Sequence, residues 1–541
     1  MEIYANYFQY ERLLDYLRNI TPELVLKLTG ASLIGFGVYY FGKILSSYRF
    51  FKKRGLKTPE YELFFGNYRE IKKENKYSNV LKKWTEKYGK TYGYFEGHLP
   101  VLVTSDLEII QEIFVKQYAN FSARKKGPLV RTENSKHSNL FTSTKSRWKK
   151  MRTIMNPTFS SSKLKELGPL LIKCSDRLLD VFDKEKERDI NVADYFKKFT
   201  MDSIWNCAFG IDIDLQNDSK NDYFDRCESV FRQTSDLTLY AYLGVYFHEF
   251  KENILVILMI LNFVMSKIVD PNYVHPFYWL RSKVVDIVEN RKVNETGRKD
   301  YVQLLLDAES DYVADDNHSM DFANKYVNKK LTFEEIKMNL VLFMLAGYET
   351  TSTALSYCSY VLAIHPEEQE KLYEEISCVF SSANDSNINS ESVQKLDYLD
   401  MFIKEVLRMY PIGNSVVARR CTKATNIKSI DIPEDLAIAV DVLSLHYDAE
   451  IWGPVDPNQF YPERFSKDIK RNPLAFMAFG NGPRNCIGMK FAIIEMKIAL
   501  VKLLLNFELK KSSKTCLELD FNEGIVRQPK NGIDICFKKR V

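Results

Sequence analysis

A single cysteine in a glycine-rich stretch, FGNGPRNCIGMKFA from Phe479 to Ala492, offers the clearest site for chemistry. Arg484 precedes Cys486 by two positions, and Gly488 follows it by two, where an apolar, helix-compatible run begins. Backbone N–H groups at a helix start favour a thiolate, and glycines let the backbone approach a flat or bulky partner. The thiol could be inert, a nucleophile or a ligand. Because no nearby histidine offers a general base, we favour a ligand.

A second segment with reactive groups is Ala346-Gly-Tyr-Glu-Thr-Thr351. It lies in the middle of a long helical pattern, where glycine costs about 1 kcal/mol and threonine hydroxyls compete for backbone carbonyls. We therefore expect a local distortion at Gly347, with Glu349 and Thr350 as an acid and an alcohol that relay protons to a small ligand. The alternative is a tolerated glycine beside an acid with ordinary partners.

The elements around these segments predict a mostly α-helical protein with small β-sheets. The helix through Ala346 begins at a capping box formed by Thr332 and Glu335, and His365-Pro366 ends it. No βαβ series or GxGxxG motif indicates a nicotinamide domain. Other expected helices are Ser161–Lys186, Glu367–Phe380, Val393–Met409 and Gly488–Asn506. Expected strands are Lys90–Phe95, Val101–Thr104, Val416–Cys421, Leu436–Val442 and Gly532–Lys538, and loops are expected at 311–330 and 384–390.

Composition excludes several other classes of protein. The chain has 541 residues and a net charge of only +5, so no global basic field indicates nucleic acid. Its nine cysteines are scattered and form no CxxC pair, which argues against a disulfide framework or a zinc site. The seven histidines include no HExxH motif. A reducing compartment is expected.

The amino terminus predicts a membrane anchor. Apolar character extends from Leu24 to Leu45, about 33 Å of helix, if Lys27 and Lys43 direct their charges outward. A cleaved signal peptide would need a basic start and a small-residue cleavage site, whereas this chain begins with acidic residues. The basic stretch that follows the span, 49–57, places the carboxyl-terminal part in the cytosol.

A second apolar run, Ile254 to Met265, is too short to span comfortably. It is either a core helix or a patch that dips into the membrane beside the anchor. We divide the chain into an extension (1–23), an anchor helix (24–47), a basic linker (48–60) and a catalytic domain (61–541).

The pattern Phe479-x-x-Gly482-x-Arg484-x-Cys486-x-Gly488 resembles the haem-binding loop of the cytochrome P-450 superfamily, the haem-thiolate monooxygenases. Four other segments resemble the family's motifs and occur in the family's order. These are Ala346–Thr351 (the oxygen-activating helix), Glu405-Val-Leu-Arg408 (the ExxR pair), Pro462–Phe465 (which contains Arg464) and Trp148–Arg152.

The branch that the chain resembles most is the animal microsomal group that contains the drug-metabolising family 3 and thromboxane synthase. The resemblance rests on MRTIMNPTFSSSKLKEL (151–167), FTMDSIWNCAFGIDID (199–214) and FMLAGYETTSTALSY (343–357). It implies a triangular α-helical domain that encloses haem b (iron protoporphyrin IX). Three features depart from the group: the hinge reads Lys57-Thr-Pro59, a turn reads Pro433-Glu434-Asp435, and residues 1–22 have no counterpart.

The resemblance also implies a role for each matched residue. Cys486 would be the axial ligand of the haem iron, with Phe479 packed beside it and Gly488 allowing close approach. Phe479 could also be a plain core aromatic. Ala346 would lie over the porphyrin, and Thr350 and Glu349 would deliver protons.

Two further groups of residues follow from the same resemblance. Trp148, Arg152, Arg484 and Arg419 would anchor the two haem propionates, although a one-residue shift would exchange Arg419 with Arg420. Glu405, Arg408 and Arg464 would form a buried ion network.

The functional expectation is an O2-dependent monooxygenase that acts on a lipophilic substrate (EC 1.14) in the endoplasmic reticulum membrane. Electrons would come from NADPH-cytochrome P-450 reductase, with cytochrome b5 as a further candidate. Lys145, Arg147, Lys149, Lys150 and Lys490 would form a docking patch for the reductase or an ordinary solvated face. The alternatives are a haem-thiolate isomerase that rearranges a lipid peroxide and a non-catalytic haem or lipid carrier. Pocket walls are expected from 121–145, the segment near Ile254 and residues after Pro411.

Overall fold

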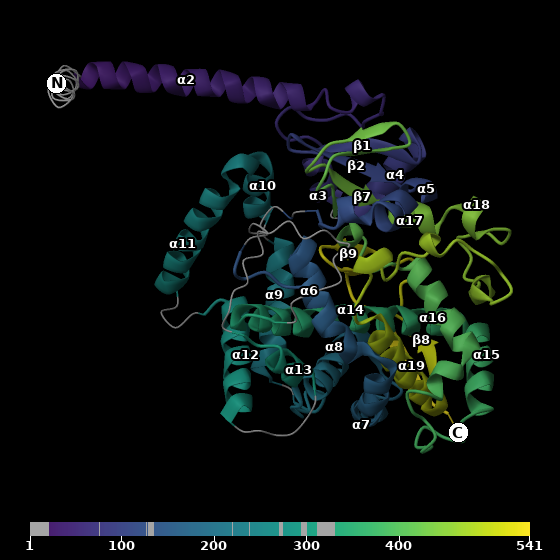
Figure 1. Ribbon diagram of the computed structural model, residues 1–541. Helices are drawn as coiled ribbons and strands as arrows, with labels where there is room; N and C mark the ends of the chain where they lie inside the picture. Colours follow the sequence, from purple (N-terminus) through teal and green to yellow (C-terminus); the bar gives the residue numbers. More distant parts are fainter. Residues whose placement is uncertain are drawn as a thin grey trace.

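The computed structural model describes residues 21–540 except 75, 126, 128–134, 219, 237, 270–273, 294–299 and 311–329. The expected amino-terminal extension and most of the expected loop 311–330 therefore lie outside the described residues. Helices dominate the described chain, and small sheets lie at its margins (Figure 1).

The helices are α2 (Pro22–Ser47), α3 (Tyr68–Glu74), α4 (Tyr77–Tyr88), α5 (Leu107–Gln111), α6 (Lys145–Met155), α7 (Ser161–Lys184), α8 (Val192–Ile204), α9 (Asp222–Asp236), α10 (Thr238–Tyr246), α11 (Lys251–Val269), α12 (Pro276–Val293), α13 (Tyr301–Asp307), α14 (Phe333–Ile364), α15 (Pro366–Ser377), α16 (Asp397–Met409), α17 (Val442–His446), α18 (Ala449–Trp452) and α19 (Met489–Asn506). The strands are β1 (Thr91–Glu96), β2 (Leu99–Thr104), β3 (Asp189–Asn191), β4 (Arg419–Arg420), β5 (Thr425–Ile427), β6 (Ile430–Ile432), β7 (Ala437–Val440), β8 (Phe507–Lys511), β9 (Phe521–Glu523), β10 (Arg527–Pro529) and β11 (Asp534–Lys539).

The largest sheet has the strand order β1-β2-β7-β4 and lies near the base of α2. β1 and β2 form an antiparallel hairpin, β2 pairs with β7 in parallel, and β4 pairs with β7 antiparallel. A second sheet has the order β3-β11-β8, in which β11 pairs antiparallel with both β3 and β8. The expectation of a mostly helical protein with small sheets is confirmed.

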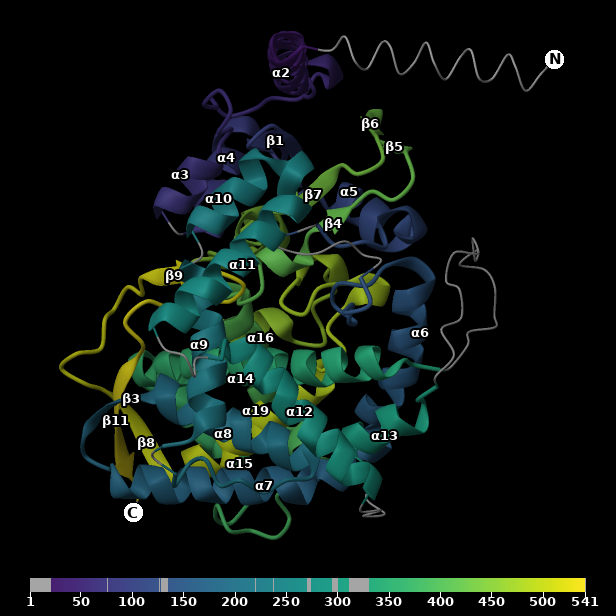
Figure 2. The same cartoon turned by 90° about the vertical axis from the view of Figure 1, so that its left-hand side faces the viewer.

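Helix α14 crosses the middle of the helical part and organises the core (Figure 2). Its capping box is present: Thr332 Oγ1 accepts a hydrogen bond from the Glu335 amide, and Glu335 Oε2 accepts one from the Thr332 amide. The side chains of 351–363 are all buried. Such a helix is held by tertiary packing on every side rather than by an amphipathic stripe.

The expected distortion at Gly347 does not interrupt the helix. The α-helix is continuous from Phe333 to Ile364, because its hydroxyls add bonds to backbone carbonyls instead of replacing them. Thr350 Oγ1 donates to the Ala346 carbonyl at 2.8 Å, and Thr353 Oγ1 donates to the Glu349 carbonyl at 2.7 Å. A Cβ at position 347 would lie 2.6 Å from Ile204 Cδ1, so a larger residue there would require the Ile204 side chain to move.

The boundaries of the other expected elements mostly hold within two or three residues. The clearest exception is the expected strand Val416–Cys421, of which only Arg419 and Arg420 pair as β4. Residues 415–417 form a 3-10 turn instead. The Val416 and Val417 carbonyls in this turn accept hydrogen bonds from arginine side chains, so they are not available to a strand ladder.

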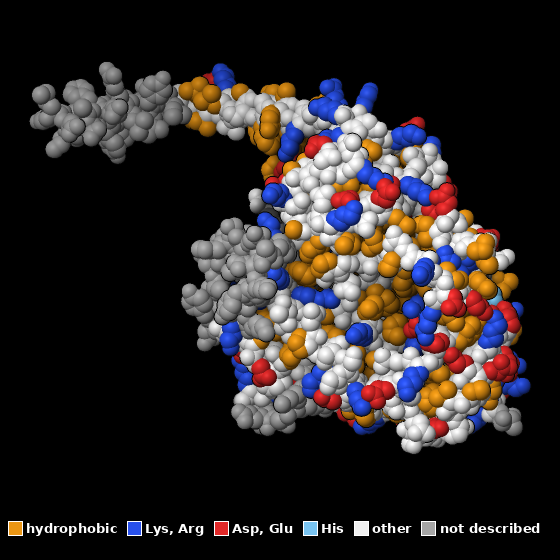
Figure 3. All heavy atoms as spheres, turned by 45° about the vertical axis from the view of Figure 1, so that its right-hand side comes forward, with side chains coloured by type: hydrophobic (Ala, Val, Ile, Leu, Met, Phe, Trp, Pro, Cys, Tyr) orange, Lys and Arg blue, Asp and Glu red, His pale blue; other side chains and the backbone are white. Residues whose placement is uncertain are grey.

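Helix α2 projects from the domain, and its apolar side chains lie on the surface (Figure 1). Among the described residues it is the one helix long and apolar enough to cross a membrane. Thr21 caps it by accepting a hydrogen bond from the Leu24 amide. Basic side chains gather where it meets the body of the protein (Figure 3), and Arg49, Lys52, Lys53 and Lys57 are exposed there.

Candidate haem-thiolate site

The loop that carries Cys486 is closed by backbone geometry that requires glycine. Gly480 and Gly482 have φ values of +66° and +70°, in the left-handed region that favours glycine. A Cβ on Gly482 would lie only 2.1 Å from the Phe114 carbonyl oxygen. The Cys486 amide donates to the Phe479 carbonyl at 2.8 Å, which turns the chain back before α19 begins. This loop therefore holds Cys486 in a fixed position.

Cys486 is exposed to open space, whereas the helix that follows it is buried in the core. Surrounding protein atoms raise the pKa of its thiol, while the amides of Gly488 and Met489 and the guanidinium groups of Arg152 and Arg124 lower it. Gly488 is the N-cap of α19, as the sequence predicts. The site thus supplies partial stabilisation for a thiolate, and a cation bound at the sulfur would supply the rest.

Four arginines converge on the space beside this loop. Arg484 is 3% exposed and donates to the Leu140 and Ser143 carbonyls at 3.1 and 2.8 Å. Arg419 is 1% exposed and donates to the Val417 carbonyl at 3.0 Å. Burial and, second, the neighbouring charge of Arg124 together lower the pKa of Arg484 to about 9.

The third and fourth cations are Arg152 and Arg124. Arg152, on α6, donates to the Asn485 carbonyl and side chain, both at 2.9 Å. Arg124 donates to the Val416 carbonyl, and burial lowers its pKa to about 10. Trp148, one turn before Arg152, is buried, and its ring lies 5.1 Å from the Arg484 guanidinium carbon.

These cations lack an anionic partner within the described chain. No carboxylate of the described residues forms an ion pair with Arg124, Arg152, Arg419 or Arg484, and the Nε–H groups of Arg124, Arg419 and Arg484 have no hydrogen-bond partner there. Buried charges are normally paired, so the cluster calls for a bound anion with more than one acidic group.

Arg419 and Arg420 have different surroundings. Arg419 lies with Arg124 and Arg484, and burial together with the charges of these two arginines holds its pKa well below its ordinary value. Arg420 instead pairs with Asp435, in the turn that departs from the family pattern.

Ala346 and Thr350 on α14 are exposed, although most of that helix is buried. Phe343, one turn before Ala346, packs on Phe159 with ring centroids 5.6 Å apart. Phe159 in turn lies 3.9 Å from the Cβ position of Gly488. These contacts bring the exposed face of α14 to the loop that carries Cys486.

Glu349 points away from that open face. Its side chain is 2% exposed, and its Oε1 lies 3.8 Å from Lys197 Nζ on α8. Burial raises the pKa of Glu349, and the charge of Lys197 offsets part of that shift. Lys197 also lies 3.5 Å from Glu228, which is 45% exposed, so the buried acid connects to the protein surface through one lysine.

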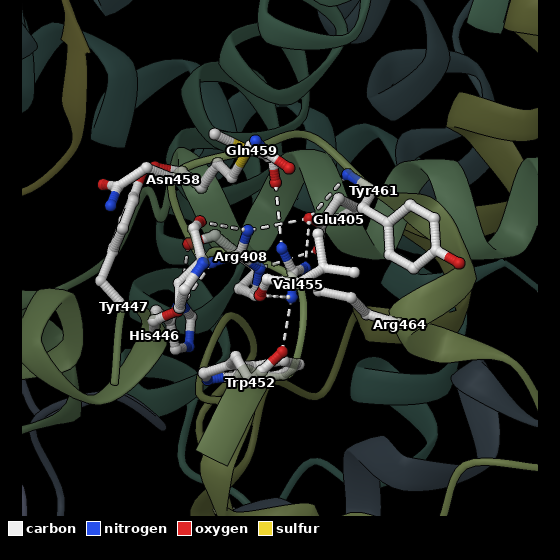
Figure 4. A network of polar contacts seen from close by, with 12 residues as sticks. Glu405, Arg408, His446, Tyr447, Trp452, Val455, Asn458, Gln459, Tyr461 and Arg464 are labelled. Atoms are coloured by element: carbon white, nitrogen blue, oxygen red, sulfur yellow. Dashed lines mark hydrogen bonds and ion pairs between the residues drawn. The ribbon is translucent and has the colours of Figure 1, made fainter. Parts of the chain in front are cut away.

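Glu405, Arg408 and Arg464 form a buried ion network (Figure 4). Arg408 Nε lies 2.7 Å from Glu405 Oε2, and Arg464 Nε lies 3.2 Å from Glu405 Oε1. The remaining arginine protons go to backbone carbonyls, including those of His446 and Pro457. The network therefore fastens α16 to the chain that leads toward the cysteine loop.

Two residues of this arrangement have no signal in the sequence. Arg124 belongs to no motif, and only the fold brings it to Cys486. His446 links the ion network to the cysteine loop, because Nδ1 contacts the Arg408 carbonyl at 2.9 Å and Nε2 accepts from the Met477 amide at 2.9 Å. Burial lowers the pKa of His446 to about 3, so the imidazole ring is neutral where it links the ion network to the cysteine loop.

Comparison with known proteins identifies the family. The family model described as Cytochrome P450 matches residues 57–537. Putative cytochrome P450 cyp-13B1 of Caenorhabditis elegans is 34% identical over 482 residues, which cover 87% of this chain and 92% of the relative. Cytochrome P450 3A29 of Sus scrofa is 33% identical over 504 residues (92% and 93%), and Lithocholate 6-beta-hydroxylase of Mesocricetus auratus is 32% identical over 516 residues (92% and 93%). The chain belongs to the cytochrome P450 family of haem-dependent monooxygenases.

The residues present fit haem b. Its two carboxylates match the arginine cluster with unpartnered N–H groups, and Cys486 would supply a thiolate ligand for its iron. Arg124, Arg152, Arg419 and Arg484 would hold the propionates, with Trp148 beside them. The positively charged surroundings would favour the thiolate.

Proposed function

We propose that this protein is a membrane-bound monooxygenase that takes electrons from NADPH through a separate flavin reductase and oxidises a lipophilic substrate. The observation that supports it most is the exposed face of α14, where Thr350 faces open space beside the cysteine loop and Glu349 lies buried next to it. A haem protein that only stored or rearranged its ligand would not need an acid and an alcohol at that position.

Haem, when bound, supplies the activation of O2. The polypeptide supplies position, a dry environment and protons. Cys486 would ligate the iron through its thiolate, and the amides of Gly488 and Met489 would tune the basicity of the sulfur. Phe479, which packs against the main core, would limit the access of water to that face.

Proton delivery would follow the path Glu228, Lys197, Glu349 and Thr350. Lys197 lies within 3.8 Å of both carboxylates, and Glu349 and Thr350 are neighbours in α14. Thr350 donates to the Ala346 carbonyl, so rotation about its χ1 bond would turn the hydroxyl toward the open face. Glu349 would thereby exchange protons with solvent without opening the site to bulk water.

We further propose that the protein resides in the endoplasmic reticulum membrane with its catalytic domain in the cytosol. α2 would be the anchor, and the basic residues of 49–57 would keep that side cytosolic. The described apolar side chains of α11 support membrane contact over a core position, because most of them are exposed. Val256, Ile257, Ile260, Leu261, Phe263 and Ile268 are 53–70% exposed.

Electron transfer would require a docking surface near α6. Lys145 and Lys490 are exposed, but Arg147 and Lys150 are bound to the buried Glu335 at 2.8 and 3.3 Å. Reversing Lys150 would therefore damage the start of α14. Lys145→Glu with Lys490→Glu is the cleaner test, and Lys173→Glu, in an exposed ion pair elsewhere, is a matched control.

The double variant should slow turnover supported by the reductase and weaken the dependence of that turnover on salt. Turnover driven by an organic peroxide bypasses the reductase and should hardly change. Equal losses in both assays would contradict docking at this surface and would indicate damage to the fold or to haem binding.

The function itself is tested with the full-length protein in bilayers containing purified reductase. The proposal expects NADPH consumption that depends on O2 and rises with a suitable lipophilic compound. Conversion of a lipid peroxide without NADPH would indicate an isomerase, and the absence of both activities would indicate a carrier. A panel of lipophilic compounds, screened by shifts of the haem absorption band, would define the substrate class.

The axial ligand is tested by Cys486→Ser, with the exposed Cys378→Ala as its control. Cys486→Ser should lose the red-shifted Soret band of the reduced carbon monoxide complex, even where the arginines retain the haem. Cys378→Ala should keep that band. Its persistence in Cys486→Ser would assign the ligand to another cysteine.

A further inference from the structure

A polar cluster joins α2 to the catalytic domain. Glu249 lies in the turn between α10 and α11, and its Oε1 accepts a hydrogen bond from Lys43 Nζ at 2.8 Å and contacts His98 Nε2 at 3.0 Å. Its Oε2 accepts a hydrogen bond from the Tyr40 hydroxyl at 3.0 Å. Tyr40 and Lys43 belong to α2, and His98 belongs to the turn between β1 and β2. We name these four residues the anchor clasp.

Aromatic rings surround the anchor clasp on the α2 side. Phe36 and Tyr40, one helical turn apart, both lie 6.2 Å from the Phe250 ring, and Tyr40 lies 6.2 Å from the His98 ring. Ile44, one turn further along α2, is completely buried. One face of α2 is therefore packed against the domain over two turns, and its other faces are free for lipid.

The charge of Glu249 depends on this arrangement. Burial alone would raise the pKa of Glu249, but the hydrogen bond from Lys43, a backbone amide and the contact with His98 bring it to about 2. The side chain is 24% exposed, and His98 is 5% exposed. Removing Lys43 would leave a partly dehydrated carboxylate beside apolar helices, which is strongly unfavourable.

The clasp lies where a membrane boundary would fall. Residues 24–42 of α2 precede Lys43 and would span about 29 Å, which matches the hydrocarbon thickness of a bilayer. Figure 2 looks at the side toward which α2 projects, and there α2 is seen end-on with α10 and α11 in front of the domain. Helix α11, whose apolar side chains are largely exposed, thus lies on the side of the protein that would face the bilayer.

We propose that the anchor clasp holds α2 and α11 as one lipid-binding surface, with the clasp at the level of the lipid headgroups and the exposed side chains of α11 in the acyl region. The partner is a phospholipid bilayer, and the inference rests on the membrane-bound function proposed above. Glu249 sets the height of α11 because it lies two residues before that helix begins and accepts two hydrogen bonds from α2.

The contact is tested first by a zero-length carbodiimide cross-link on the full-length haem protein in bilayers. A cross-link between Lys43 and Glu249, found by mass spectrometry, is expected. The exposed pair Lys173–Asp212 is the positive control. A cross-link at Lys173–Asp212 without one at Lys43–Glu249 would overturn the proposal.

The coupling to α11 is tested by labelling with a phospholipid that carries a diazirine in the middle of an acyl chain. The single variants Lys43→Glu and Glu249→Lys should reduce the label on α11 by about fivefold relative to the label on α2. The double variant, which restores opposite charges, should recover most of it. Lys173→Glu, a charge reversal of the same kind in the catalytic domain, should leave the labelling unchanged.

Equal labelling of α11 in all variants would show that the anchor clasp does not set the depth of α11 in the bilayer. So would single variants that lose label without recovery in the double variant. The carbon monoxide spectrum of each variant separates this result from the proposed function. Loss of haem-thiolate absorption in the unmodified protein would contradict the proposed function, whatever the labelling shows.

Discussion

Lys197 Nζ lies 3.8 Å from Glu349 Oε1, and this contact controls the buried acid beside Thr350. The other carboxylate oxygen, Oε2, has no hydrogen-bond partner among the described residues. Burial raises the pKa of Glu349, Lys197 lowers it, and Glu228 raises it again. Glu349 therefore keeps its proton to higher pH than an exposed glutamate does. The charge of Lys197 limits the rise in the pKa of Glu349.

Replacing Lys197 with Met removes the positive charge that lowers the pKa of Glu349. Because Lys197 also lies on the proposed proton path, the rate should fall. A proton donor is active while it is protonated, so the alkaline limb of the remaining activity should move to higher pH by about one unit. Lys198→Met, at the neighbouring position on α8, is the matched control and should leave that limb in place. An unchanged or lowered limb in Lys197→Met would remove Glu349 from the proton path.

Local sequence patterns were sufficient to predict the parts of the site that lie within single segments. The Cys486 loop and the helix through Thr350 have their own capping and glycine signals. Arg124 could not be predicted, because its position beside Cys486 depends on how a loop packs against the turn at 415–417. The clasp between Lys43 and Glu249 joins residues 206 positions apart, and no local pattern encodes such a contact.

Replacing Glu405 with Gln should destabilise the protein and release haem. The change leaves Arg408 and Arg464 buried without a countercharge, which costs about 3–5 kcal/mol. The cysteine loop should loosen as well, since His446 connects Arg408 to Met477. Glu463→Gln, which removes a partly exposed partner of Lys371, should change stability by less than about 0.5 kcal/mol. Thermal midpoints and haem content measure both effects, and equal midpoints would contradict a structural role for the network.

Glu495 on α19 predicts a stability that depends on pH. Its side chain is 1% exposed, and burial raises its pKa from the ordinary 4.5 to about 8. Between these two values the folded protein retains a proton that the unfolded chain releases. The stability contribution of Glu495 therefore falls as the pH rises through this window.

Glutamine at position 495 keeps the shape of the acid and never ionises. Glu495→Gln should match the unmodified protein near pH 4.5 and exceed its stability by up to about 5 kcal/mol at pH 8 and above. The exposed Glu86→Gln should give no such divergence. Unfolding midpoints across this pH range provide the measurement. A constant difference between Glu495→Gln and the unmodified protein would show that Glu495 does not retain a proton in the fold.

The last prediction concerns the two glycines before Cys486. Both have positive φ, so alanine is strained at either position by about 1 kcal/mol. They differ in their surroundings. A Cβ on Gly480 meets nothing closer than 3.8 Å, whereas a Cβ on Gly482 would collide with the Phe114 carbonyl at 2.1 Å. The position of the cysteine loop at Gly482 thus depends on a close backbone contact as well as on backbone conformation.

Gly480→Ala should consequently retain haem and the red-shifted Soret band of the reduced carbon monoxide complex, with a slightly lower unfolding midpoint. Gly482→Ala should displace the loop from Phe114, which moves Cys486 away from the iron and abolishes that band. The pair separates steric contact from backbone strain, since the strain is common to both variants. If Gly482→Ala kept the band as well as Gly480→Ala does, the close approach to Phe114 would not be what positions the thiolate.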